Sequence, residues 1–131
     1  MELQMEFDFA GRSILIIDDE VDFLEILGSV LEHHNASVLT ASTGRDGFEM
    51  ARTHIPDIIV SDISMPGING FDFLRLIKQF PLTSRIPVVA ITSHKDDHYR
   101  KRAIASGFNE FVSKPIQYAT FFAQLDNLMQ S

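Results

Sequence analysis

Five short apolar segments recur along the chain, and each is separated from the next by a stretch long enough for a helix. They are residues 14–17, 38–41, 58–60, 88–91 and 111–112. Uninterrupted runs of Val and Ile suit strands that are covered on both faces, as the strands of parallel sheets are, and such strands are joined by right-handed crossovers. The sequence therefore predicts an α/β fold, in which the five strands of a doubly wound parallel sheet alternate with five helices.

The segments between these runs carry apolar residues at helical spacing, which we interpret as faces that pack against the sheet. The spacing is clearest in three helices, at Val21, Leu24, Gly28 and Leu31, at Phe48, Ala51 and Ile55, and at Phe121, Leu125, Leu128 and Met129. The fourth helix, expected within residues 95–106, offers the core chiefly Tyr99, Ala103, Ile104 and Ala105. So few apolar anchors predict a mobile helix at this position.

Length and charge limit the classes of function. The chain has 131 residues, 18 of them acidic and 11 basic, and a formal net charge of −7. That length suits one domain, and we expect an N-terminal extension at residues 1–12 followed by a single domain over residues 13–131. The negative field disfavours direct binding to nucleic acid or to an anionic membrane surface. The chain has no cysteine, which excludes disulfides and thiolate metal sites.

The N-terminal extension carries acidic side chains before any basic one and has no long apolar block. That charge order is wrong for a secretory signal, so we predict a cytoplasmic protein. Leu3, Met5, Phe7 and Phe9 alternate with other residues, a spacing compatible with an added strand or a docking segment. A disordered tail is the simpler expectation for such a terminal segment.

Five polar residues stand at or just after the carboxyl ends of the predicted strands. They are Asp18, Asp19, Asp62, Thr92 and Lys114. Open parallel sheets bind ligands at this edge, and three carboxylates brought together there would raise one another's pKa values unless a cation shared the site. Oxygen ligands favour a hard divalent ion, so we predict Mg²⁺, or Mn²⁺ in its place. Zinc is not favoured, because no ligand set with these carboxylates is formed by His33, His34, His54, His94 and His98.

This set of side chains also predicts a type of chemistry. A carboxylate held beside Mg²⁺, with an ammonium and a hydroxyl group opposite, is suited to phosphoryl transfer, which depends on positioning and on neutralising the equatorial oxygens. Asp62 is then the nucleophile that forms an acyl phosphate. The metal reduces the repulsion between the attacking carboxylate and the anionic phosphoryl group.

Four strings in the chain resemble the response-regulator receiver family of two-component phosphorelay signalling. They are ILIIDDE at 14–20, DIIVSDISMPGINGFDFL at 57–74, VVAITS at 88–93 and GFNEFVSKPI at 107–116. The resemblance runs from about Ser13 to the end of the chain. It implies a flavodoxin-like sheet with the strand order 2-1-3-4-5.

The resemblance also implies a role for each matching site residue. Asp62 is the phosphoacceptor, and Asp18 and Asp19 hold the metal with it. The backbone carbonyl of Ser64 completes the metal site. Lys114 bonds the phosphoryl group, and the family bond that corresponds to Lys114–Pro115 is usually cis.

Further positions concern the signal and its lifetime. Thr92 is the hydroxyl that swings toward the phosphoryl group, and Phe111 is the aromatic that turns inward as it moves. Together they are expected to reshape the surface formed by the fourth helix, the fifth strand and the fifth helix. In the family, positions matching Ser64 and His94 tune hydrolysis of the acyl phosphate, and the small Ser93 leaves the phosphate accessible.

The implied partners are a histidine kinase or histidine phosphotransfer protein as donor and a downstream protein target that binds the switch surface. We expect no direct nucleic-acid or membrane partner, and a monomer or weak dimer. The protein is not expected to be a conventional enzyme, because it acts only on its own Asp62 through autophosphorylation and autodephosphorylation.

Three other classes of protein fit the sequence less well. A docking module that is never phosphorylated would not need the intact acidic site. An electron carrier of the flavodoxin type needs a phosphate-cradling loop after the first strand, where Asp18, Asp19 and Glu20 would repel a phosphate. A phosphatase with an aspartyl intermediate would need an aspartate two residues beyond its nucleophile, and that position is Ser64.

Overall fold

The computed structural model describes residues 7–93 and 97–130. Its five strands form one parallel sheet in the order β2-β1-β3-β4-β5, which confirms the predicted fold class and strand order. The strands are β1 (Ser13–Ile17), β2 (Ser37–Ala41), β3 (Ile58–Asp62), β4 (Val88–Thr92) and β5 (Glu110–Ser113). Each is bounded within one or two residues of the apolar run that predicted it.

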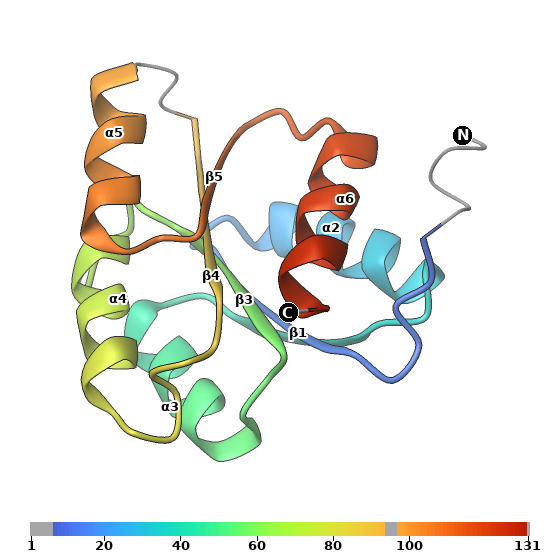
Figure 1. Cartoon of the computed structure of the whole chain (residues 1–131), viewed down its shortest axis with the longest axis horizontal. Helices are drawn as coiled ribbons and strands as arrows, with labels where there is room; N and C mark the ends of the chain where they lie inside the picture. The colour runs from blue at the N-terminus through green and yellow to red at the C-terminus, as the bar shows by residue number, and fades with distance from the viewer. Residues whose placement is uncertain (1–6, 94–96, 131) are drawn as a thin grey trace.

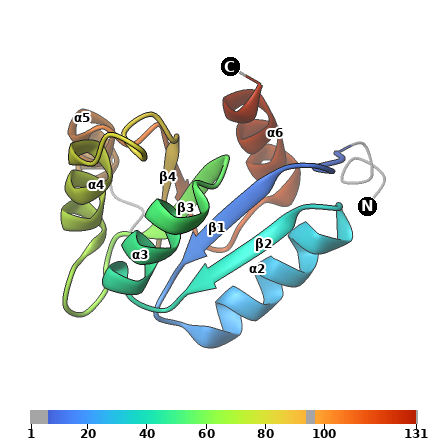
Figure 2. The ribbon, with the colours of Figure 1, turned by 90° about the horizontal axis from the view of Figure 1, so that it is seen from below.

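Five helices connect and follow the strands. They are α2 (Val21–His33), α3 (Gly44–His54), α4 (Gly70–Gln79), α5 (Asp97–Ser106) and α6 (Tyr118–Met129). Helices α2 and α6 cover one face of the sheet, and α3, α4 and α5 cover the other, so the fold has three layers (Figure 1, Figure 2). None of the helices among the described residues is both long and apolar enough to cross a lipid bilayer.

Each face of the sheet has its own hydrophobic core, because successive strand residues point to opposite faces. Ile14 and Ile16 pack with residues of α2 and α6. Leu15 and Ile17 pack on the opposite side, with α3, α4 and α5. All four side chains are fully buried, as expected for a central strand of a parallel sheet.

Four residues predicted to face the core do not. Val21, the first residue of α2, is 56% exposed. Ile55 caps α3 in the left-handed backbone region at φ 45° and is 42% exposed. Ile104 and Ala105 are exposed, and Ala103 is the buried residue of α5. The expectation that α5 is weakly anchored therefore agrees with its packing.

Residues 7–12 pack against the domain, so a disordered tail is wrong for this part of the extension. Phe9 is 1% exposed and its N–H donates to the carbonyl of His34 at 2.7 Å. The Nδ1 of His34 donates in turn to the carbonyl of Phe7 at 2.8 Å. Both phenylalanine rings contact Phe122 of α6 edge to face. The predicted positions Leu3 and Met5 lie outside the described residues.

Candidate functional site

The site lies where the parallel strands end, on the loops that follow β1, β3, β4 and β5. Asp18 and Asp19 follow β1, and Asp62 and Thr92 are the last residues of β3 and β4. The register pairs Asp62 with Ile91 and Thr92 with Ser113. Because all strands run in one direction, their carboxyl ends meet at one edge of the sheet, where the predicted residues were expected to converge.

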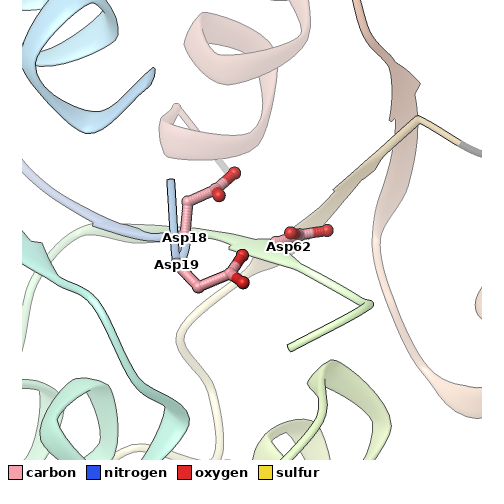
Figure 3. Close-up of side chains that lie close together, drawn as sticks. All are labelled: Asp18, Asp19 and Asp62. Carbon is pink, nitrogen blue, oxygen red and sulfur yellow. The ribbon is translucent and has the colours of Figure 1, made fainter. Parts of the chain in front are cut away.

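Three carboxylates form the centre of the site. Asp18, Asp19 and Asp62 each offer one oxygen to a group whose atoms all lie within 4.8 Å of one another. The three side chains converge from the ends of β1 and β3 (Figure 3). Asp18 is fully buried and Asp62 is 6% exposed, whereas Asp19 is exposed. Two of the three carboxylates are therefore buried, and the cluster is open to solvent at Asp19.

The electrostatics of this cluster favour a proton or a cation on Asp62. Burial, followed by repulsion from Asp18, raises the pKa of Asp62 to about 6 from the ordinary 3.8. Lys114 and the N–H of Ser64 oppose that rise by stabilising the charged form. Since burial and a neighbouring carboxylate both penalise the anion, a bound cation would be favoured at neutral pH.

Lys114 lies beside the acidic cluster, and its side chain is hydrogen-bonded to residues that follow β1. Its Nζ donates to Asp18 Oδ2 at 2.8 Å and to Glu20 Oε1 at 2.9 Å, and it lies 4.2 Å from the centre of the Phe23 ring. Burial lowers the pKa of Lys114, but the two carboxylate partners outweigh it and the net shift is upward. Among the described residues no hydrogen bond joins Lys114 to Asp62.

Glu20 and Phe23 are site residues that the strand-end pattern did not predict. Both belong to the segment that begins α2, and only the fold shows that it passes beside the loop after β5. The sequence did contain one signal for a cation beside Glu20. Glu20 directly follows Asp18 and Asp19, and a third carboxylate next to two predicted metal ligands is stabilised by a cation of its own.

The loop between β3 and α4 packs closely against the end of β3 that carries Asp62. The N–H of Ser64 donates to Asp62 Oδ1 at 3.3 Å. Gly70 begins α4 so close to this strand end that a Cβ atom there would lie 2.6 Å from the carbonyl oxygen of Asp62 and from the Cα of Ile63. Asn69 caps the helix by accepting from the N–H of Asp72 at 3.0 Å. The absence of a side chain at Gly70 thus allows α4 to start directly against Asp62.

The remaining predicted residues take up the following positions. Thr92 is fully buried and its carbonyl accepts from the N–H of Lys114 at 2.9 Å, whereas Ser93 is exposed. The Lys114–Pro115 peptide bond is cis. Phe111 lies 2% exposed in the core shared with α3, α4 and α5. His94 lies outside the described residues.

The donor set fits a hard divalent cation. The cluster consists of carboxylates, and no histidine of the described ranges belongs to it. Mg²⁺ and Mn²⁺ prefer oxygen ligands, whereas the usual zinc sites contain histidine or cysteine. The raised pKa of Asp62 is a second sign that the site is built to receive positive charge.

Comparisons with known proteins agree with this geometry. The family model described as the response regulator receiver domain matches residues 14–126. The chain belongs to this family, the receiver domains of two-component signalling. Proteins of this family take a phosphoryl group from histidine kinases and act on downstream targets, and in general they are not conventional enzymes.

Several relatives show the range of proteins that contain such a domain. Protein PilH of Pseudomonas aeruginosa is 33% identical over 116 residues, which are 88% of this chain and 96% of that protein. Response regulator PleD of Caulobacter vibrioides is 36% identical over 115 residues, 88% of this chain but 25% of its own length.

Solved structures show the same fold. A response regulator receiver domain protein from Clostridium thermocellum aligns with a TM-score of 0.83 at 30% identity, over 91% of this chain and 94% of its own. Chemotaxis protein CheY4 of Vibrio cholerae aligns with a TM-score of 0.84 at 24% identity, over 91% and 99% of the two chains.

Proposed function

We propose that Asp62 accepts a phosphoryl group from a histidine kinase or a histidine phosphotransfer protein, and that the aspartyl phosphate changes which partner this domain binds. The observation that carries the proposal is the cluster of Asp18, Asp19 and Asp62 within 4.8 Å, with the ammonium of Lys114 bonded to Asp18. This arrangement supplies a nucleophile, two further metal ligands and a cation at one strand edge.

The reaction transfers one phosphoryl group. A carboxylate oxygen of Asp62 attacks the phosphorus of the donor, and the bond from phosphorus to the donor atom breaks. The leaving group keeps the electron pair and takes up a proton from solvent. Asp62 must be ionised to attack, so the pKa of about 6 allows reaction at neutral pH.

Asp18, Asp19 and Asp62, with the backbone carbonyl of Ser64, would hold Mg²⁺ or Mn²⁺. When bound, that ion supplies charge neutralisation for the phosphoryl oxygens and the attacking carboxylate. Asp18 Oδ1 accepts from the N–H of Glu20 at 2.9 Å and Asp18 Oδ2 accepts from the ammonium of Lys114 at 2.8 Å. These contacts would orient the carboxylate of Asp18 as a metal ligand before an ion binds.

The response would begin with Lys114 and Thr92. A phosphoryl group on Asp62 competes with Asp18 and Glu20 for the Lys114 ammonium, and it gives the buried Thr92 hydroxyl a charged acceptor. To move a conformational balance from 1:99 to 99:1, such contacts must supply about 5.5 kcal/mol of preference for one state. Phe111 is the proposed relay, because it lies one strand away from Thr92 and beneath α5.

The proposed switch surface consists of α5, β5 and α6. A groove of about 490 Å³ opens there, and its lining includes Arg100, Phe111, Pro115, Gln117, Phe121 and Gln124. Arg100 lies over the Phe111 ring, 5.1 Å from its centre. A movement of Phe111 would therefore displace Arg100 and change the groove that a downstream protein contacts.

The proposal also covers the hydrolysis of the aspartyl phosphate and the location and oligomeric state of the protein. Ser64 and Ser93, both exposed beside the site, and His94 would set the access of the hydrolytic water. We place the protein in the cytoplasm as a monomer or weak dimer, with residues 13–131 as the receiver domain. Autophosphorylation and autodephosphorylation at Asp62 would be its own chemistry.

Intact-mass spectrometry tests the chemistry. The protein is incubated with acetyl phosphate, with Mg²⁺ or with a chelator, and compared with Asp62→Ala and Asp57→Asn. Asp57 precedes the same strand at its far end and its Oδ2 accepts from the N–H of Ser13, a role that asparagine retains. We expect one added phosphoryl group in the wild type and in Asp57→Asn with Mg²⁺, and none in Asp62→Ala or with chelator.

Equal phosphorylation of Asp62→Ala would place the acceptor elsewhere. No phosphorylation of the wild type, in a sample whose Mg²⁺ binding is shown by calorimetry, would instead favour a docking module that works without phosphate.

A further inference from the structure

The charges of this acidic protein are unevenly distributed over its helices. Helices α2 and α6 contain Asp22, Glu25, Glu32 and Asp126 and no lysine or arginine. Helices α4 and α5 contain five basic residues, Arg75, Lys78, Arg100, Lys101 and Arg102, against Asp72 and Asp97. All five basic residues are exposed. A chain with a net charge of −7 thus presents a basic surface on α4 and α5, which lie beside each other in both views (Figure 1, Figure 2).

Two hollows lie between these helices and share one aromatic residue, Phe71. The first, of about 350 Å³, is lined by Phe71, Leu74, Arg75, Lys78, Gln79 and Ser106. The second, of about 380 Å³, extends along Phe71, Tyr99 and Arg102 to Ser64 and Asn69. We call the two together the α4–α5 furrow. Its lining combines apolar side chains, with Phe71 common to both hollows, and polar ones, and the basic residues Arg75, Lys78 and Arg102 stand along its rims.

Phe71 is held as a rigid platform. Its ring contacts Tyr99 of α5 and Phe108 edge to face, with centroids 6.1 and 5.9 Å away. The guanidinium carbon of Arg102 lies 4.1 Å from the same centroid, a cation–π arrangement that leaves the charge at the rim. The ring is half-buried, so part of it remains available to a partner.

The rim charges are poorly neutralised within the molecule. Arg75 pairs with Asp72 at 3.1 Å, but both side chains are largely exposed. Lys78 contacts the carbonyl of Ser84 at 3.4 Å, a long hydrogen bond to a neutral group. Within the described ranges, neither Lys78 nor Arg102 forms an ion pair with a carboxylate. Both charges are therefore available to an anionic ligand.

We propose that the α4–α5 furrow binds an acidic amphipathic helix of a partner protein. An apolar residue of that helix would cover the exposed part of Phe71, and carboxylates one turn to either side would meet Arg102 and Lys78. Such a helix-in-groove contact combines a central apolar anchor with a charged rim. The strongly negative remainder of the molecule disfavours nucleic acid and anionic membrane as the occupant.

This surface is distinct from the proposed switch groove, which lies on the other side of α5 between that helix, β5 and α6. The proposal does not rest on phosphorylation of Asp62, and its test uses the unphosphorylated protein. A failure here would leave the proposed function intact, and a protein that is never phosphorylated would leave this docking site intact.

The probe is a fluorescein-labelled synthetic helical peptide with glutamate on one face and leucine on the other. Fluorescence anisotropy gives its Kd, and ¹⁵N chemical-shift mapping locates it on the protein. We expect shifts at Phe71, Leu74 and Arg102, and a Kd that rises with salt because rim charges are screened. A peptide with alanine in place of leucine should bind at least about tenfold more weakly.

Three charge reversals make the test specific. Arg102→Glu and Lys78→Glu alter the furrow and should each raise the Kd at least about tenfold. Lys101→Glu makes a matched charge change on α5 outside the lining of the furrow, and it should change the Kd less than about threefold. Thermal unfolding checks that all three variants are folded.

Several outcomes would overturn the proposal. An equal loss of affinity in Lys101→Glu and Arg102→Glu would show attraction to a general basic field rather than to the furrow. Absence of binding by the folded wild type would also refute it. Light scattering that shows a dimer broken by Arg102→Glu would make the occupant a second copy of this chain, whose α2 carries Asp22, Glu25 and the 60% exposed Ile26.

Discussion

The ammonium of Lys114 donates to the carboxylate of Asp18 across 2.8 Å and joins the loop after β5 to the end of β1. Asp18 is fully buried and the Lys114 side chain is 15% exposed, so this is an internal ion pair. The hydrogen bonds of the ammonium go to Asp18 and Glu20, while Asp62 interacts with it only through their opposite charges. Phosphorylation would therefore have to draw Lys114 from an existing partner.

Replacing Lys114 by methionine keeps the length of the side chain and leaves Asp18 buried without its cation. We expect the free energy of unfolding in chelator to fall by about 3 kcal/mol, since an unpaired buried charge is strongly unfavourable. Saturating Mg²⁺ should stabilise this variant more than the wild type, because the ion replaces the missing charge. Urea unfolding with and without Mg²⁺ measures both effects. Lys78→Met is the surface control, and an equal loss in both variants would contradict the prediction.

The raised pKa of Asp62 makes stability depend on pH. The folded protein holds this proton more tightly than the unfolded chain, because the pKa is about 6 in the fold against the ordinary 3.8. This contribution to stability is complete below about pH 3.8 and is lost as pH rises through about 6. At about pH 8 without metal, Asp62→Asn should be more stable than the wild type by up to about 3 kcal/mol.

That advantage should shrink toward about pH 3, below the ordinary pKa of 3.8, where Asp62 is largely neutral in both states, and Mg²⁺ should reduce it at high pH. Urea unfolding across this pH range gives the curve. A constant difference between the two proteins at every pH would show that titration of Asp62 is not its cause.

A substitution at Gly70 tests how closely α4 must approach the end of β3 that carries Asp62. A Cβ atom in Gly70→Ala would meet the backbone of Asp62 and Ile63 at 2.6 Å, so the helix or the strand end must move. We expect a loss of about 1–3 kcal/mol in stability and slower phosphorylation by acetyl phosphate. Gly28→Ala is the matched control, since its Cβ would have an ordinary 3.6 Å contact with Val38. Equal phosphorylation rates in both variants would show that the approach is not needed.

Thr92 separates acceptance of the phosphoryl group from the response to it. Thr92→Ala should still gain one phosphoryl mass on Asp62, because the carboxylates and Lys114 remain. It should lose the phosphorylation-dependent amide shifts in α5, β5 and α6, whereas Thr92→Ser should retain most of them through its hydroxyl. NMR spectra before and after phosphorylation make the comparison. A full response in Thr92→Ala would remove the hydroxyl from the switch.

Sequence predicted the sheet and the acidic cluster for the same physical reason. Short buried strands are recognisable in the sequence as apolar runs of Val and Ile. Parallel strands then bring residues such as Asp18 and Asp62 to one edge of the sheet. The outcome at single helix positions was less predictable, because exposure depends on where a helix overlaps the sheet. Val21 has the right helical phase but is 56% exposed at the first position of α2.

Contacts between segments that are distant in the chain could not be predicted from the sequence. Lys114 and Glu20 are 94 residues apart, and nothing in the local pattern of either residue indicates their pairing. Similarly, the alternation of Phe7 and Phe9 is compatible with several structures. Only the position of α6 shows that both rings pack on Phe122.

The segment before β1 should therefore contribute to stability. Phe9 is 1% exposed and packs against Phe122, so Phe9→Ala would leave a cavity between the extension and α6. We expect a loss of about 3–5 kcal/mol in the free energy of unfolding, measured in urea. Ile26→Ala, at a 60% exposed position, should change it by less than about 0.5 kcal/mol. If Phe9→Ala were as stable as Ile26→Ala, the packing of residues 7–12 would contribute nothing to the fold, and the extension would behave as the disordered tail that its sequence suggested.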